Sequence, residues 1–405
     1  MTTNIITILG ATGSIGSSTL DIIRHQSRLG HQWQIHALSG FSQLDKLFEL
    51  CAEFHPNRVC VPSDKVDKFA HHLSSSGLDI DVVGGQAGLM DLASDEKSGK
   101  IIAGIVGSAG LRSTLTAVKA GKTVLLANKE SLVMAGDLVM QTARTQKATI
   151  LPIDSEHNAI FQCLPQAVQM DNVVIHQTDF GIKQLWLTAS GGGFLYKSYV
   201  DMQNATVAQA VKHPNWNMGQ KISIDSATMM NKGLELIEAC HLFNLDESQI
   251  QIAIHPQSIV HSMVEYIDGS VLAQLGEPDM KTPIAHALAY PKRMSNGVKP
   301  LNLFEIGALE FICPDKDKFK ALDLARAAAK AGNGACIALN ASNEILVSAF
   351  LNHQIRLTDI ADMVEKVLND GELHTHFNTN FHNIDDILLF DERVRAKTHI
   401  YLKAM

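Results

Sequence analysis

The fold is decided by the stretch Ile5-Ile6-Thr7-Ile8-Leu9-Gly10-Ala11-Thr12-Gly13-Ser14-Ile15-Gly16. Its β-branched, apolar start is typical of a buried parallel strand, and a helical pattern follows to about His25. Glycines between a strand and a helix predict a dinucleotide-binding loop, because they let the backbone approach a pyrophosphate beside free helix N–H groups. The spacing is G-x-x-G-x-x-G rather than G-x-G-x-x-G, so a tight turn without a ligand stays the alternative.

Beyond this loop, strand patterns alternate with helical ones. We expect strands at 33–38, 58–61, 81–83, 101–103 and 123–127, and helices at 44–54, 65–73 and 111–120. Such alternation predicts an α/β fold, here a Rossmann-like doubly wound sheet over residues 1–150. The second strand ends in Ser39-Gly40-Phe41-Ser42. Because an NAD site usually has an acid at this point, its absence favours NADP, although no Lys or Arg stands there either.

The pattern changes after residue 150. Residues 151–292 read as an α+β catalytic domain with strands at 184–189, 252–254 and 260–266, and a long helix from about Ser226. Its sheet is expected to be open on one face, which a dimer partner would cover. Turn signals at Asn296-Gly297 and Lys299-Pro300 mark 293–315 as a linker. Residues 316–405 are predicted to form a C-terminal α-helical bundle domain.

Composition excludes several classes of protein. The 405 residues are 46% apolar and 19% charged, as in soluble enzymes, and the net charge of −8 argues against broad nucleic-acid binding. A small phosphorylated substrate remains compatible with that charge. The six cysteines form no C-x-x-C pair. The first apolar run is too short to span a membrane, so we expect a cytoplasmic location and no membrane partner.

Three acids in two motifs predict a metal site. Asp154 and Glu156 lie two residues apart near a strand end and therefore point to the same side. Glu235 follows Asn231 and Lys232 at the spacing that puts all three on one helix face. Carboxylate oxygens are ligands suited to Mg²⁺ or Mn²⁺. The alternative is solvated loop charges and an exposed helix residue, which the apolar neighbours Ile153 and Ile160 disfavour.

Further side chains suit an anionic substrate. Lys129 follows a predicted strand end, where ligands of open α/β sheets bind, although it could be a surface lysine paired with Glu130. Donors suited to a phosphate are Ser190 with its three following glycines, His213, Ser226, Asn231 and Lys232. Residues 213–219, which include Trp216 and Met218, read as a flap that excludes water. A flexible turn at the glycines and a structural loop with Trp216 in the core are the alternatives.

Together these motifs resemble the 1-deoxy-D-xylulose 5-phosphate reductoisomerase family. The resemblance is carried by Gly10–Gly16, Ala127–Ser131, Ile153–Gln162, His213–Trp216 and Asp225–Glu235. It implies a homodimer that uses NADPH and a metal, Mg²⁺ or Mn²⁺ with Co²⁺ as a further candidate, on a phosphorylated sugar. The product would be 2-C-methyl-D-erythritol 4-phosphate, in the non-mevalonate (MEP) pathway of isoprenoid biosynthesis.

The resemblance also implies roles for particular residues. The metal ligands would be Asp154, Glu156 and Glu235, which with Lys129 form the catalytic set. The substrate contacts would be Lys129, Ser155, Glu156, Ser190, His213, Trp216, Met218, Ser226, Asn231, Lys232 and Glu235. The NADPH contacts would be Gly10, Thr12, Gly13, Ser14, Ile15, Gly40, Phe41, Ser42, Asn128, Glu130 and Gly219.

One departure concerns the cofactor. The family commonly has a basic residue and then Asn after Gly40, where this chain has Phe41 and Ser42. The 2′-phosphate would then be held by backbone and by hydroxyls such as Ser39 and Ser42, or less tightly. A smaller departure is Asn217, where Ser is familiar.

Two rival functions stay open at this point. A metal-independent NADP-linked dehydrogenase would need a thiol nucleophile such as Cys163, which no helix start or histidine obviously activates. A dinucleotide-sensing regulator would leave the acidic residues unexplained.

Overall fold

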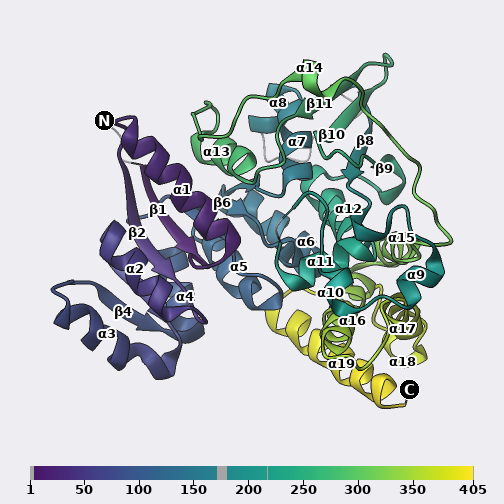
Figure 1. Ribbon diagram of the computed structural model, residues 1–405. Coiled ribbons are helices and arrows are strands. Elements are labelled where there is room, and N and C mark those ends of the chain that lie inside the picture. Colours follow the sequence, from purple (N-terminus) through teal and green to yellow (C-terminus); the bar gives the residue numbers. More distant parts are fainter. Residues whose placement is uncertain (1–3, 171–179, 217, 405) are drawn as a thin grey trace. The chain divides into compact units, whose positions relative to one another are not determined.

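The structure is a computed structural model that describes residues 4–170, 180–216 and 218–404 (Figure 1). The chain forms two compact units. Unit 1 contains Met1–Ser131, Val139–Asn158 and Asp279–Lys299, and unit 2 contains Leu132–Leu138, Ala159–Pro278 and Pro300–Met405. The expected catalytic domain, linker and helical domain thus share unit 2 for most of their length, while the four-part division stays a prediction.

Unit 1 is built on a seven-stranded parallel sheet in the order β4-β3-β2-β1-β5-β6-β7. Its strands are β1 (Asn4–Leu9), β2 (Trp33–Ser39), β3 (Arg58–Val61), β4 (Asp81–Gly84), β5 (Lys100–Ala103), β6 (Thr123–Leu126) and β7 (Thr149–Pro152). The order reverses between β1 and β5, which is the switch point where ligands of such sheets bind. The predicted doubly wound sheet is confirmed, and β7 is the strand that was expected to end near Asp154.

Helices connect these strands (Figure 1). They are α1 (Ser14–Arg28), α2 (Leu44–Phe54), α3 (Val66–Ser75), α4 (Gly85–Ser94), α5 (Leu111–Lys119), α6 (Lys129–Gln146), α7 (Ser155–Cys163) and α13 (Lys281–Ala289). Both ends of α6 and the first turn of α7 belong to unit 1, whereas Leu132–Leu138 of α6 belongs to unit 2, and α6 is kinked at Ala135. Although α13 lies far along the chain, it packs against α1.

Unit 2 contains a four-stranded sheet in the order β11-β10-β8-β9. Its strands are β8 (Ile182–Ala189), β9 (Ile250–Ile254), β10 (Val260–Tyr266) and β11 (Val271–Leu275). The three predicted strands are present, and β11 adds an antiparallel edge. Leu272 on β11 is half exposed, so the edge strand presents an apolar side chain to solvent, while the open face stays a prediction. At the other edge, Ile312 of the expected linker bridges Ile254 of β9.

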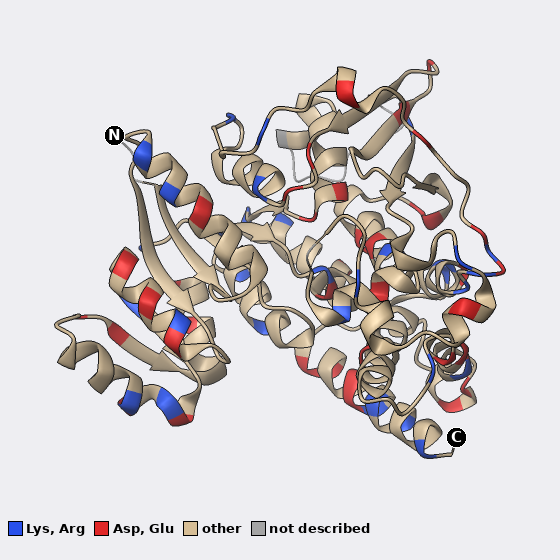
Figure 2. Cartoon of the chain, viewed as in Figure 1, with Lys and Arg blue, Asp and Glu red and all other residues tan. Residues whose placement is uncertain are grey.

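The helices of unit 2 include the predicted terminal bundle. They are α8 (Gln166–Met170), α9 (Tyr199–Gln203), α10 (Val207–Ala210), α11 (Gln220–Ala227), α12 (Met230–Phe243), α14 (Leu303–Ile306), α15 (Ala321–Ala331), α16 (Asn333–Leu351), α17 (Asp359–Leu368), α18 (Gly371–His374) and α19 (Ile384–Lys403). α16 packs against α15, α17 and α19. It is apolar and long enough to match a membrane span, but 78% of that segment is buried, as in the core helix of a bundle. Acidic and basic residues both occur along α19 (Figure 2).

The long helix expected from about Ser226 is two helices instead. α11 already begins at Gln220, and α12 begins at Met230 after a break at Met229. Met229 has a left-handed backbone with φ of 63°, a conformation that a regular α-helix does not contain. The break lets Ser226 and Asn231 lie on separate helices.

Candidate functional site

The glycine loop joins β1 to α1 in unit 1. Gly10 has φ of +84°, and a Cβ there would lie 2.8 Å from the carbonyl oxygen of Gly104. A Cβ on Gly16 would lie 2.4 Å from the carbonyl oxygen of Ala11. α1 begins at Ser14, and no side chain caps its N-terminus. The loop therefore requires glycine at two positions and presents uncapped backbone at the start of a helix, as a pyrophosphate site does.

The end of β2 lies beside this loop. A Cβ on Gly40 would come within 3.0 Å of the Thr12 side chain. Ser39 is buried, and its Oγ accepts a hydrogen bond of 2.9 Å from the Gly10 amide. Phe41 and Ser42 are exposed. Ser39 is thus committed to holding the loop, which leaves Ser42 as the hydroxyl at this turn that is open to solvent.

Asn128, Lys129 and Glu130 lie where β6 leads into α6. Asn128 caps α6, because its side chain accepts a hydrogen bond from the Ser131 amide and donates one of 3.0 Å to the Gly107 carbonyl. Lys129 is buried, and its Nζ lies 2.5 Å from Oδ2 of Asp154. The alternative of a surface lysine is therefore wrong. Lys129 instead forms an ion pair with Asp154, one of the predicted metal ligands.

The first acidic motif lies between β7 and α7. Asp154 follows the strand, whereas Glu156 lies in the first turn of α7. Carboxylate oxygens of Asp154 and Glu156 lie within 4.8 Å of one another. The Ser155 hydroxyl donates a hydrogen bond of 2.6 Å to Oε2 of Glu156. Two half-buried carboxylates this close form an oxygen donor pair suited to a hard divalent cation.

The second acidic motif lies on α12 of unit 2. Glu235 is fully buried and accepts hydrogen bonds from the side chains of Asn231 and Lys232. Lys232 is buried as well. The spacing predicted this shared helix face, and the alternative of an exposed Glu235 is wrong. Removing the partner of a buried carboxylate costs several kcal/mol, of order 3–5, so the ammonium of Lys232 and the amide of Asn231 stabilise the buried Glu235 side chain.

The hydrogen bonds of His213 orient the Ser190 hydroxyl. Nδ1 of His213 accepts from the amides of Asn215 at 3.1 Å and Trp216 at 3.0 Å. In a neutral ring Nε2 then carries the proton, and it lies 2.8 Å from Oγ of Ser190. Oγ also accepts from the Gly192 amide at 3.3 Å. With both acceptor positions occupied, the Ser190 hydroxyl is left to donate, which suits a phosphate oxygen.

Ser226 lies against the glycine run. A Cβ on Gly192 would come within 2.5 Å of the Ser226 carbonyl oxygen, and both Gly191 and Gly192 have positive φ. Glycine is therefore required for close packing here, and the flexible-turn alternative does not describe this segment. Trp216 and Met218 are half-buried, and Gly219 precedes α11. Asn217 lies outside the described residues.

The predicted site residues thus form one set in each unit. Unit 1 holds the glycine loop, the end of β2, Asn128–Glu130 and Asp154–Glu156, whereas unit 2 holds Ser190, His213, Gly219, Ser226 and Asn231–Glu235. Sequence reasoning missed two contacts beside these sets. Lys46 reaches the glycine loop, and Asn343 of α16 reaches Asp225. A lysine three residues into the second helix was a usable signal for the first, but nothing in the sequence pairs Asn343 with Asp225.

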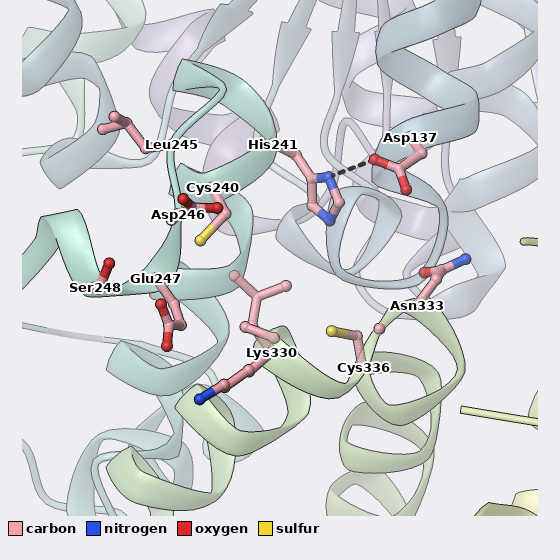
Figure 3. Close-up of a pocket in the computed structure, with 13 residues that line it drawn as sticks. Asp137, Cys240, His241, Leu245, Asp246, Glu247, Ser248, Lys330, Asn333 and Cys336 are labelled. Atoms are coloured by element: carbon pink, nitrogen blue, oxygen red, sulfur yellow. Dashed lines mark ion pairs between the residues drawn. The ribbon is translucent and has the colours of Figure 1, made fainter. Parts of the chain in front are cut away.

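Unit 2 also has a cavity of about 520 Å³ that contains none of the predicted residues (Figure 3). It is lined by the C-terminal part of α12 and by the junction of α15 with α16. His241 points across it to Asp137, with 3.2 Å between Nδ1 and Oδ1. Burial raises the pKa of the lining Cys240 thiol to about 12, so this cysteine is protonated and unreactive at neutral pH.

A parallel sheet with a glycine loop at its switch point, together with paired carboxylates, buried lysines and an oriented serine, defines a dinucleotide-dependent oxidoreductase. Models of 1-deoxy-D-xylulose 5-phosphate reductoisomerase match residues 6–136, those of its C-terminal domain match 150–243, and a DXP reductoisomerase C-terminal domain matches 275–397. The chain belongs to the 1-deoxy-D-xylulose 5-phosphate reductoisomerase family.

Individual relatives agree over nearly the whole length. The chain is 61% identical to 1-deoxy-D-xylulose 5-phosphate reductoisomerase of Psychrobacter arcticus, over 97% of this chain and 96% of the relative. It is 48% identical to that of Pseudomonas putida, over 98% of both chains. These relatives favour the reductoisomerase over the metal-independent dehydrogenase and the regulator.

Solved structures are equally similar. A crystal structure of DOX-P reductoisomerase in complex with NADPH, fosmidomycin and magnesium has a TM-score of 0.96 and 59% identity, covering 99% of this chain and 98% of that one. The enzyme from Zymomonas mobilis in complex with NADPH has a TM-score of 0.88 and 40% identity, covering 100% of both chains. The predicted fold class is confirmed.

Proposed function

We propose that this chain catalyses the NADPH- and divalent-metal-dependent conversion of 1-deoxy-D-xylulose 5-phosphate to 2-C-methyl-D-erythritol 4-phosphate, in the non-mevalonate route to isoprenoids. Family membership across nearly the full chain supports the reaction. The observation that carries it at the level of residues is the close pair of Asp154 and Glu156 beside Lys129. A simple dehydrogenase has no use for such a pair, whereas rearranging a phosphorylated hydroxyketone does.

The metal ligands are Asp154, Glu156 and Glu235, and the ion is Mg²⁺ or Mn²⁺. All three side chains offer hard oxygen donors, which fit these ions. The proximity of the Asp154 and Glu156 carboxylates supports the assignment, as do the hydrogen bonds that hold Glu235. When bound, the ion polarises the carbonyl and adjacent hydroxyl of the substrate, and NADPH supplies the hydride.

The remaining chemistry belongs to side chains of this protein. Lys129, whose ammonium lies at Asp154, stabilises negative charge that develops on substrate oxygens. The donating hydroxyl of Ser190 binds the phosphate, together with His213, Ser226, Asn231 and Lys232. Binding of the distant phosphate helps to fix the reacting end of the substrate. Trp216 and Met218 exclude water from it.

NADPH binds at the glycine loop of unit 1. Its contacts are Gly10, Thr12, Gly13, Ser14, Ile15, Gly40, Phe41, Ser42, Asn128, Glu130 and Gly219. The support is the glycine-dependent loop at the switch point of the sheet and the capped start of α6. The relatives solved with NADPH have the same fold over their whole length.

The working form is a homodimer that pairs through the open side of the β8–β11 sheet. Val271, Leu272 and Leu275 of the edge strand expose apolar surface, and an exposed apolar edge strand promotes association unless it is covered. We place the enzyme in the cytoplasm, where its six free cysteines would stay reduced. Sedimentation at the mass of two copies is expected, and a stable monomer at working concentration would contradict the dimer.

The deciding experiment is NADPH oxidation with 1-deoxy-D-xylulose 5-phosphate, before and after removal of metal with a chelator. Activity should disappear with the metal and return with Mg²⁺. Glu235→Gln should lower turnover by roughly 100-fold while NADPH binding stays within about twofold. Glu247→Gln, in the same unit but outside the site, is the matched control and should keep full turnover.

Each negative outcome has a separate meaning. Turnover that persists after thorough metal removal would refute the metal role and favour a metal-independent dehydrogenase. Loss of folding in Glu235→Gln, seen by circular dichroism, would make Glu235 a structural residue rather than a ligand.

A further inference from the structure

Lys46 is a basic residue beside the cofactor loop that none of the predicted contacts includes. It lies in the first turn of α2, and its Nζ donates to the Thr12 carbonyl and to Oγ of Ser17, each at 2.9 Å. An ammonium has three N–H donors. Two of them are thus used on the described residues, which leaves one donor and the full positive charge at the loop.

Lys46 is connected to the end of β2 through Thr12. Thr12 accepts from Lys46 through its carbonyl, and its side chain lies against Gly40, where a Cβ would come within 3.0 Å. Gly40 marks the end of β2, and that strand end is where doubly wound folds hold the cofactor ribose and decide between a 2′-hydroxyl and a 2′-phosphate. Lys46 therefore contacts Thr12, the residue that lies between Lys46 and the end of β2.

The other groups at this turn cannot supply the charge. Residues 39–43 contain no Lys, Arg, Asp or Glu. Ser39 is buried and bonded to Gly10, and Phe41 is apolar and exposed. Asp45 is exposed, so its charge is largely screened by water and salt. A 2′-phosphate carries close to two negative charges, and Lys46 is the cation among residues 39–46 that can meet it.

We propose that Lys46 binds the 2′-phosphate of NADPH and thereby sets the preference of this enzyme for NADPH over NADH. The proposal rests on the proposed function, in that it requires NADPH to bind at the glycine loop. A purely structural Lys46 would only tie α2 to the loop. It would then affect NADPH and NADH equally, which makes the two roles separable.

The test is calorimetric binding of two adenine nucleotides, 2′,5′-ADP and 5′-ADP, to the purified chain. Lys46→Gln should raise the dissociation constant of 2′,5′-ADP by roughly tenfold or more, the size of a charge-assisted hydrogen bond. It should leave that of 5′-ADP within about twofold. Lys46→Arg should keep most of the wild-type difference in affinity between 2′,5′-ADP and 5′-ADP. Lys68→Gln removes an exposed lysine of the same unit and should change neither nucleotide.

A second variant separates charge from structure. Phe41→Lys adds a cation five residues before Lys46, and in the Lys46→Gln background it should recover part of the lost 2′,5′-ADP affinity. Equal weakening of both nucleotides by Lys46→Gln, or no weakening of either, would overturn the proposal. If Lys46→Gln does not fold, Lys46→Arg and Phe41→Lys are compared with the wild type, and an unchanged preference in Phe41→Lys counts against a 2′-phosphate at this turn. Failure of the wild-type chain to bind NADPH or NADH at all would instead refute the proposed function.

Discussion

The contact between Asp225 and Asn343 should couple the proposed phosphate-binding segment around Ser226 to the helical bundle. Asp225 lies on α11, next to Ser226, and is only 1% exposed. Its Oδ1 accepts a hydrogen bond of 2.8 Å from Asn343 Nδ2 on α16, and its Oδ2 lies 2.9 Å from Nζ of Lys221. Both partners of the first bond are buried, so the bond is neither screened by salt nor replaced by water when it is broken.

The magnitude follows from this geometry. A hydrogen bond to a charged group contributes roughly 1.5–3 kcal/mol. Asn343→Ala loses that bond and leaves a small cavity, so unfolding should become easier by about 2–4 kcal/mol. Lys221 is partly exposed, so its pair with Asp225 adds less. The coupling in a double-mutant cycle of Asp225→Ala with Asn343→Ala should therefore be about 2 kcal/mol.

The assay is urea unfolding followed by tryptophan fluorescence, since Trp186 and Trp216 both lie in unit 2. The substrate KM should rise in Asn343→Ala, because Asp225, the residue before Ser226, loses its hydrogen bond to α16, while NADPH affinity should not change. A coupling below about 0.5 kcal/mol would show that the contact does not stabilise the unit. An unchanged KM would show that it does not position Ser226.

Two further predictions concern unit 1. Gly16→Ala should prevent normal folding because its Cβ would lie 2.4 Å from backbone oxygen, whereas Gly13→Ala meets its nearest neighbour at 3.4 Å. Gly13→Ala should therefore fold but bind NADPH more weakly than the wild type. Circular dichroism and nucleotide titration compare the two variants, and equal stability of Gly16→Ala and Gly13→Ala would refute the packing argument. Burial, helped by the charge of Arg293, lowers the pKa of His286 to about 4. The unfolded chain binds that proton near the ordinary value of 6.5, so stability should fall, by up to about 3 kcal/mol, as pH drops from 6.5 towards 4. His286→Gln should flatten this dependence in thermal melts, and an equal slope in both proteins would exclude His286 as its source.

Local sequence patterns predicted the strands and helices of unit 1 better than they predicted which segments of the chain belong to that unit. The strands of the sheet are buried on both faces, and their apolar runs are easy to recognise. Nothing local indicates that α13, more than 200 residues later, packs on α1. That membership depends on tertiary contacts such as the hydrogen bond of 2.8 Å between His25 and Ser295. Residues on both sides of the predicted boundary at 292, from Asp279 to Lys299, therefore belong to unit 1.

The same distinction holds for the candidate site. The spacing of Asn231, Lys232 and Glu235 predicted a shared helix face because helical geometry is periodic, and the structure shows both hydrogen bonds. The partner of Lys129 was missed, since Glu130 is its neighbour in sequence but Asp154 is its neighbour in space. The proposed role of Ser190 depends on the tautomer of His213, which follows from the amide donors of Asn215 and Trp216 and not from the sequence.

In both acidic motifs a lysine forms an ion pair with a proposed metal ligand. Lys129 is paired with Asp154, and Lys232 with Glu235. Each lysine neutralises a carboxylate that would otherwise be costly to bury. A divalent cation at these carboxylates would take over that neutralisation, so each ammonium would become available to an anion. Lys129 would then turn to the reacting oxygens and Lys232 to the phosphate. Bound metal would thus raise the affinity for substrate, and bound substrate would raise the affinity for metal, so the two should bind cooperatively. Lys129 and Lys232 would provide this coupling.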